Sequence, residues 1–443
     1  MKKILWLLLF FSVITYPEKG MAAENLQAVI DSAKDGAVIQ LEGKIYHGNI
    51  VIDKPLQISG KKGTVIEGDG KGNVISVRAP GVTVSNLHVK NGGMDRNSPE
   101  EYAAIKVYTD GNVIRDIEIE KSFHGVYLSK AHNNTIENVK IRGLGKGEIA
   151  AQGNGLHVYY SNGNLLKNNY IEGTRDGMFF DYANDNKAIS NEITKTRYGL
   201  HYMYSDRNEF KNNIFTFNTG GAAIMHSNQL KLKNNQFIFN YGHRSFGLLV
   251  LSANENTIEN NTFYMNQRGL YIDQSTDNLI LANHISQNQI GIELWASSNK
   301  QIFTKNTIEE NTIPAVTLGG TGQNQWSLEG IGNHWGASFP LLDLDQNGIS
   351  DSPAIYKSSL YELIEDQELT YLFLKSPAIK IYEKMNQLMD NEKVMFKDEH
   401  PLTENRSNIN LVVIVILAII ITAILTKRRQ LLCITFGKNG RKI

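Results

Sequence analysis

Three consecutive segments of equal length decide the fold: GLHVYYSNGNLLKNNYIEGTRD at 155–176, GMFFDYANDNKAISNEITKTRY at 177–198 and GLHYMYSDRNEFKNNIFTFNTG at 199–220. Each has 22 residues and starts with a glycine, followed by a short stretch in which apolar side chains alternate with others. A fixed period of this length is typical of a solenoid, in which each repeat contacts only its neighbours. The glycine recurs, with insertions, at Gly125, Gly155, Gly177, Gly199, Gly221, Gly247, Gly269 and Gly291.

The alternation predicts which side chains fill the interior. Residues 1, 3, 11 and 16 positions after each glycine are apolar or tyrosine, as three sides around one filled core require. At position 11 these are Ile136, Leu166, Ala188, Phe210, Leu232, Ile258, Ile280 and Ile302; at position 16 they are Ile141, Ile171, Ile193, Phe215, Phe237, Phe263 and Ile285. The sequence therefore predicts an all-β chain, a single-stranded parallel β-helix over residues 24–320.

Asparagine marks the corners of the predicted coils. It recurs at positions 9, 13 and 14 after the glycines, as in Asn208, Asn212 and Asn213. Asparagine tolerates the left-handed backbone that a sharp corner needs. Amides stacked coil on coil can also bond to one another along the axis. We therefore assign these asparagines a structural role.

Both ends of the chain indicate export and a membrane tether. Residues 1–23 have the positive start, short apolar run and small residues of a secretory signal, and Leu26 to Ala33 follow as a short amphipathic helix that caps the solenoid. Residues 409–426 form an 18-residue apolar segment, near the lower limit for a transmembrane helix. Because Lys427, Arg428 and Arg429 follow directly, the tail 427–443 is predicted to be cytoplasmic and the solenoid to lie outside the cell membrane.

Composition excludes two classes of chemistry. The only cysteine, Cys433, falls in the predicted tail, so the exported part has neither a disulfide nor a thiolate metal ligand. Lysine plus arginine equals aspartate plus glutamate, at 45 each. No overall basic field therefore points to nucleic acid.

Positions 2 and 4 after each glycine point outward and are rich in histidine, methionine and aromatic residues, with no lysine or arginine at these positions. Met203 and Met225 occupy the same column in adjacent coils, with Cβ atoms expected ~5 Å apart. His201 lies on the same face and His226 follows Met225. Thioethers and imidazoles suit copper(I), and His157 extends the patch. The alternative is an apolar contact surface for a partner.

An acidic site is the rival interpretation of the same face. Asp273 and Glu293 are offset by one coil and two residues, so their carboxyl groups are expected ~8 Å apart, within the range of an inverting glycosidase. Tyr271 and Trp295 beside them are suited to stacking on a sugar ring.

Two features follow the solenoid. In the closing segment 321–355, Asp343, Asp345 and Asn347 copy the first half of a calcium-binding EF-hand loop, although its twelfth position is alanine; a tight Asx turn is the alternative. Residues 356–408 are predicted to be helical, ending in a polar linker from Asp398. Their apolar stripe of Ala378, Tyr382, Met385 and Met389 either caps the open end of the solenoid or docks on a partner.

The closing turn Gly332-Asn333-His334-Trp335-Gly336, with the 22-residue coils and the Asp-rich loop, resembles the β-helix class of carbohydrate-binding and sugar-hydrolase domains. The segment Phe373-Leu374-Lys375-Ser376-Pro377-Ala378, followed by Tyr382-Glu383, narrows the resemblance to the NosD family, over about Glu24 to Met389. That resemblance implies that the protein acts with the permease and ATPase of an ABC transporter. It also implies that the protein binds copper transiently, receiving it from a chaperone and delivering it to nitrous-oxide reductase, an enzyme of denitrification. It implies no catalytic residue. The family is soluble in the periplasm, and the apolar segment here departs from that pattern.

We therefore expect an accessory assembly factor rather than an enzyme, tethered to the outer face of the cell membrane. A cell-surface polysaccharide-active enzyme (hydrolase, lyase or epimerase) is the second hypothesis, and a passive adhesin or sugar-binding module is the third.

Overall fold

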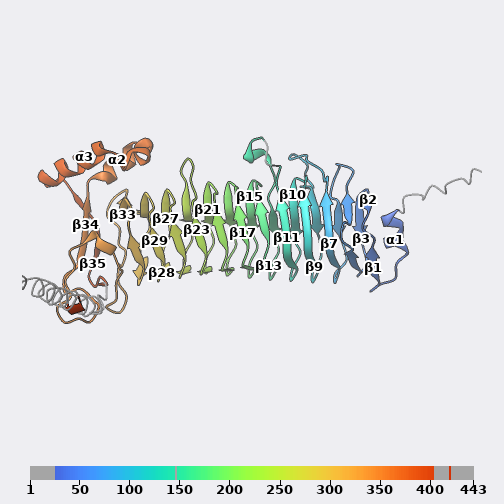
Figure 1. Cartoon of the computed structure of the whole chain (residues 1–443), viewed down its shortest axis with the longest axis horizontal. Helices are drawn as coiled ribbons and strands as arrows, with labels where there is room; N and C mark the ends of the chain where they lie inside the picture. Colours follow the sequence, from blue (N-terminus) through green and yellow to red (C-terminus); the bar gives the residue numbers. More distant parts are fainter. Residues whose placement is uncertain (1–24, 145–146, 404–418, 421–443) are drawn as a thin grey trace, which may run out of the picture.

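The computed structural model describes residues 25–144, 147–403 and 419–420. They form one long solenoid, with helix α1 (Leu26–Ser32) at one end and the C-terminal elements at the other (Figure 1). Leu26 and Ile30 of α1 are buried, as expected of a cap. Within the described part of the chain, no helix has both the length and the apolar character to cross a membrane. The predicted signal 1–23 and, except for Ile419 and Ile420, the segment 409–426 lie outside the described residues.

The solenoid is built from parallel sheets that run along its axis. One side is a sheet of 12 described strands: β3 (Ile50–Ile52), β6 (Ile75–Val77), β8 (Ala103–Val107), β10 (His124–Ser129), β12 (Leu156–Tyr159), β15 (Asp176–Asp181), β18 (Tyr198–Met203), β21 (Gly220–Met225), β24 (Phe246–Leu251), β27 (Arg268–Asp273), β30 (Ile290–Trp295) and β33 (Ile313–Leu318).

The other two sides share 21 described strands, because three long strands bend from one side to the next. These strands are β1 (Val38–Leu41), β2 (Ile45–His47), β4 (Gln57–Gly60), β5 (Val65–Glu67), β7 (Thr83–Lys90), β9 (Val113–Glu120), β11 (Thr135–Arg142), β13 (Leu165–Lys167), β14 (Tyr170–Glu172), β16 (Lys187–Ile189), β17 (Glu192–Thr194), β19 (Glu209–Lys211), β20 (Ile214–Thr216), β22 (Lys231–Lys233), β23 (Gln236–Ile238), β25 (Thr257–Glu259), β26 (Thr262–Tyr264), β28 (Leu279–Leu281), β29 (His284–Ser286), β31 (Ile302–Thr304) and β32 (Thr307–Glu309).

The predicted interior is confirmed, with one exception. The residues at positions 1, 3, 11 and 16 are buried in one continuous core. Glycine at the start of each coil lets neighbouring coils approach closely, because a Cβ on Gly199 would lie 2.6 Å from the carbonyl oxygen of Gly221. Ile302 is wrong. Phe303 pairs with Ile280 and is fully buried, whereas Ile302 is partly exposed. The last coils are one residue longer, and a shift of one residue moves a side chain to the opposite face.

The asparagine corners are confirmed as hydrogen-bonded ladders. Asn213 donates from its backbone N–H and from its side-chain amide to Oδ1 of Asn235, both at 2.9 Å. Its amide also donates to the carbonyl oxygen of Ala188. Asn212 adopts a left-handed φ of 58°. A further buried ladder, absent from the sequence prediction, stands at position 19 as Asn218, Asn240, Asn266 and Asn288.

An antiparallel pair closes the C-terminal end, where the sequence predicts only helix and linker. β34 (Ala354–Ser358) pairs with β35 (Lys393–Asp398), and Phe396 stacks on Trp335 with ring centroids 4.2 Å apart. Asp398, predicted to begin a polar linker, is fully buried and accepts a 2.9 Å hydrogen bond from Nε1 of Trp335. The open core needs apolar cover, and β35 supplies it with Met395 and Phe396.

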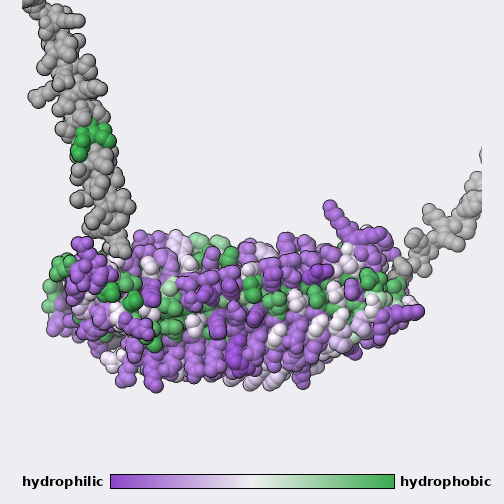
Figure 2. Space-filling view, turned by 90° about the horizontal axis from the view of Figure 1, so that it is seen from below, coloured by the Kyte–Doolittle hydropathy of each residue, from purple (hydrophilic) through white to green (hydrophobic). Residues whose placement is uncertain are grey.

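The remaining short elements are helical and lie outside the sheets. Two 3-10 turns are η1 (Ile149–Ala151) and η2 (Gly336–Ser338). A helical arm of α2 (Leu360–Asp366), η3 (Glu368–Phe373) and α3 (Pro377–Leu388) lies along one edge of the C-terminal end (Figure 1). The flank seen in Figure 2 is mostly hydrophilic, with apolar residues in an interrupted band along the axis.

Candidate functional site

A continuous column of side chains follows position 2 along the outer face of the 12-stranded sheet. In register from coil to coil it contains Lys106, Tyr127, His157, Phe179, His201, Ala223, Leu249, Tyr271 and Glu293. Most are buried although they lie outside the core. In several coils the residue before the glycine packs against the column, as Tyr198 does on His201 and Arg268 on Tyr271. Basic residues reach this face from outside the repeat positions: Lys106 continues the column one coil before Gly125, and Arg268, the residue before Gly269, contacts Glu293.

His201 is the most firmly positioned member of the predicted copper patch. Its Nδ1 lies 3.0 Å from Oδ2 of Asp176, which is 1% exposed. Arg197 donates to both oxygens of the same carboxylate, at 2.9 and 2.6 Å. Burial raises the pKa of Asp176, but the hydrogen bonds from His201 and Arg197 outweigh it and hold the pKa below its ordinary value. The carboxylate is therefore charged and can only accept, so Nδ1 of His201 donates its proton to it at 3.0 Å; Nη2 of Arg197, also a donor, lies farther from Nδ1, at 3.4 Å.

The structure brings the two methionines together and sets His226 slightly apart. Met203 and Met225 are register partners on β18 and β21, and both are half-buried. His226 is exposed at the corner after β21, with a φ of 49°. Its ring stacks on Tyr204 with centroids 5.0 Å apart, continuing an aromatic ladder along that corner.

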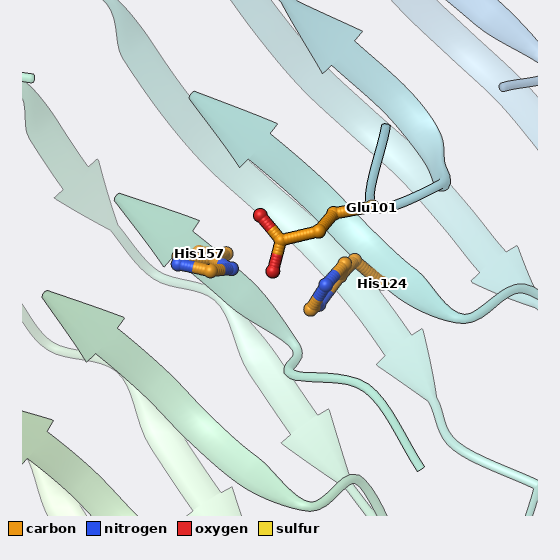
Figure 3. A group of neighbouring side chains, drawn as sticks. All are labelled: Glu101, His124 and His157. Atoms are coloured by element: carbon orange, nitrogen blue, oxygen red, sulfur yellow. The ribbon is translucent and has the colours of Figure 1, made fainter. Parts of the chain in front are cut away.

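A second group of metal-binding residue types lies further along the column. Glu101, His124 and His157 offer ligand atoms that all lie within 4.8 Å of one another, and the carboxylate of Glu101 lies between the two imidazole rings (Figure 3). The sequence prediction missed Glu101 and His124. No repeat position connects them, because Glu101 belongs to the irregular loop before β8 and His124 to the coil with a long insertion.

The proton of His124 disfavours a metal at this second group. The backbone N–H of Asn154 donates to Nδ1 of His124 at 2.9 Å, so the neutral ring keeps its proton on Nε2. Burial lowers the pKa of His124 to about 3 and that of His157 well below its ordinary value. Both rings are therefore neutral, and an ion could bind Nε2 of His124 only by breaking the Asn154 hydrogen bond.

The predicted acidic pair is not an open site. Glu293 is 1% exposed, accepts a 2.7 Å hydrogen bond from the hydroxyl of Tyr371 on η3, and lies 3.4 Å from Nη1 of Arg268. Asp273 accepts from the hydroxyl of Ser297 at 2.8 Å. The expectation that Glu293 faces a substrate is therefore wrong, because the helical arm covers it.

The Asp-rich loop forms Asx turns, the alternative to a calcium site. Asp343 accepts hydrogen bonds from the backbone N–H groups of Asn347 and Gly348 at 3.1 and 2.9 Å. Asn347 accepts from the N–H of Ile349 at 2.7 Å, and Asp345 from the N–H of Asn347. These oxygens stabilise the loop's own backbone.

Comparisons with known proteins agree with the solenoid and its resemblance. A family model described as "Periplasmic copper-binding protein (NosD)" matches residues 144–338. The "Probable ABC transporter binding protein NosD" of Pseudomonas aeruginosa is 35% identical over 379 residues, which cover 81% of this chain and 86% of that protein. This chain belongs to the NosD family. A second NosD relative, from Stutzerimonas stutzeri and described in the same words, is 31% identical and covers 81% of this chain and 84% of its own length.

Solved structures show likeness at the level of a β-helix. The periplasmic alginate epimerase AlgG is 14% identical with a TM-score of 0.44, over 68% of this chain and 82% of that one. The surface adhesin PfbA of Streptococcus pneumoniae is 11% identical with a TM-score of 0.45, over 69% and 92%.

Proposed function

We propose that this NosD-family chain is an exported, membrane-tethered accessory factor that receives copper(I) on its outer face. In this proposal it works with an ABC transporter, takes copper from a chaperone and supports maturation of the copper centre of nitrous-oxide reductase. Family membership and the names of its relatives, which describe copper binding and an ABC transporter, support the proposal. It needs no catalytic residue.

The arrangement around His201 is the observation that carries the copper site. A buried carboxylate holds the ring by Nδ1, and the two methionines of the same face are in register. Thioether sulfur and imidazole nitrogen are ligands that copper(I) accepts. We assign His201, Met203 and Met225 to the site, and His226, next to Met225, as the fourth ligand.

The helical arm is the surface that we assign to the permease. β34 and β35 close the end of the solenoid, and the helical arm packs on the same core through Ile379 and Tyr382, which leaves the rest of the α3 stripe facing outward. Met385 and Met389 of the predicted stripe are 56% and 63% exposed. Nearby on the same segment, Ile381 and Leu388 are 60% and 77% exposed. Such a contiguous apolar surface is typical of an interaction site.

Replacing Met203 and Met225 together with leucine tests the copper site. Leucine keeps volume and apolarity, so the fold should be retained, whereas two soft ligands are lost. We expect copper(I) affinity, measured by competition with a colorimetric chelator, to fall on the order of 100-fold, or about 2.8 kcal/mol. Reductase matured in cells carrying this variant should lack activity.

A matched control is Met178→Leu, the same change at a fully buried core position on β15. It should leave copper affinity unchanged. Equal copper(I) affinities for the double variant and the parent would show that Met203 and Met225 are not copper ligands.

A chain ending at Asn405 tests the tether. The core of the solenoid is closed by β35, so we expect a folded soluble protein that is released into the medium. Fractionation and immunodetection measure the outcome. Membrane association of the truncated chain would place the anchor in another part of the molecule.

A further inference from the structure

We infer that Asp176 is a positioning residue that fixes His201 with its proton on Nδ1 and so presents the free lone pair of Nε2 to a soft metal ion. This inference deepens the proposed copper site and rests on it. Asp176 lies neither at position 2 nor at position 4 of its coil, and it touches no proposed ligand except His201.

The contacts leave the carboxylate little freedom. Asp176 lies on β15, one coil before His201 on β18, and its main chain is in register with Tyr198. Oδ1 accepts from Nε of Arg197, while Oδ2 accepts from Nη2 of Arg197 and from Nδ1 of His201. Such a two-pronged arginine contact fixes both the position and the charge of a carboxylate.

Aromatic neighbours hold the imidazole in its plane. The ring of Phe179 stacks on that of His201 with centroids 4.6 Å apart and an interplanar angle of 29°. The ring of Tyr198 meets it edge-on at 5.3 Å and 72°. His201 keeps 11% of its side chain exposed, so the ring is oriented by its surroundings but not sealed from the surface.

A histidine that binds a metal through one nitrogen commonly donates the other N–H to a carboxylate, which fixes the tautomer and raises the basicity of the binding nitrogen. His201 has this arrangement. His124 has the opposite one, because its Nδ1 accepts the N–H of Asn154. His201 and His124 are thus buried histidines with opposite tautomers, and of these two only His201 offers Nε2 as a ligand.

The test uses the full chain labelled with ¹⁵N-histidine, and Asp176→Ala as the variant. In the metal-free parent, ¹⁵N chemical shifts and ring couplings should report His201 with its proton on Nδ1. In Asp176→Ala, the proton should move partly or wholly to Nε2. Copper(I) affinity, measured by chelator competition, should fall about 10- to 100-fold.

Arg197→Ala is the matched control. This variant removes the arginine of the Arg197–Asp176 ion pair but keeps the Asp176 carboxylate, which accepts the proton of the His201 imidazole. We expect an unchanged tautomer and a smaller loss of copper affinity than in Asp176→Ala. If Asp176→Ala fails to fold, Asp176→Asn keeps the volume and removes the charge, and it should still lower the affinity.

The outcomes separate this inference from the proposed function. An unchanged tautomer and unchanged copper affinity in the Asp176 variant overturn the positioning role. A parent chain that binds no copper(I) overturns the copper site, while the tautomer of the metal-free chain still decides whether Asp176 orients His201.

Discussion

Replacing Phe237 with alanine lowers the free energy of unfolding by about 3–5 kcal/mol. Phe237 is fully buried and its ring lies between those of Phe215 and Phe263, with centroids 5.1 and 5.0 Å away. Adjacent coils cannot collapse into the cavity, because asparagine ladders and strand pairing fix their spacing. Phe215→Ala should cost a similar amount for the same reason.

Thermal and urea unfolding followed by circular dichroism measure this effect, as a lower midpoint in both. The control is Phe217→Ala. Phe217 stacks on Phe239 with centroids 5.4 Å apart but is 60% exposed, so its loss should cost less than about 1 kcal/mol. Equal midpoints for Phe237→Ala and Phe217→Ala would refute the inward assignment of position 16.

Replacing Arg268 with methionine should destabilise the C-terminal end of the solenoid by about 3–5 kcal/mol at neutral pH, because it leaves the carboxylate of Glu293 buried without a cation. Arg268 and Glu293 are 5% and 1% exposed, and their side chains lie 3.4 Å apart. The guanidinium also lies over the rings of Tyr271 and Tyr371, at 4.6 and 5.3 Å.

The pH dependence of this variant identifies the cause. Burial already raises the pKa of Glu293 in the parent protein, and loss of Arg268 should raise it further. A carboxyl group with a higher pKa in the folded state binds its proton more tightly there, so stability falls as pH rises from the unfolded to the folded pKa. The destabilisation should therefore be small at acid pH and full at neutral pH.

The double variant Arg268→Met with Glu293→Gln is the control for this effect. It removes the buried charge as well, so it should recover most of the lost stability and show no such pH dependence. A double variant as unstable as Arg268→Met at neutral pH would mean that packing, and not the unpaired charge, sets the cost.

The same column of side chains connects the proposed copper site with the helical arm. Four coil steps lead from His201 through Ala223, Leu249 and Tyr271 to Glu293, about 19 Å at the spacing of neighbouring strands. Glu293 binds Tyr371 of the arm. The surface that we assign to the permease is thus held at the end of the face that we assign to copper.

The sequence by itself determined the β-helix, its period, nearly all of its interior and the roles of its corner asparagines. These features are local and repeated. A side chain that faces inward in one coil faces inward in the next as long as the period holds, because neighbouring coils pair in register. Where one residue is inserted, the rule fails, and Phe303 rather than Ile302 fills the core.

Tertiary structure alone decided which outward residues are accessible and what holds them. Glu293 and Asp273 are near neighbours in the repeat, yet a segment 78 residues further along the chain covers Glu293 through Tyr371. Asp176 contacts His201, 25 residues away, from a position outside the outward pattern. Periodicity predicts the direction in which a side chain points. Burial and hydrogen bonding on the outer face depend instead on irregular loops and on the arm, whose packing has no period.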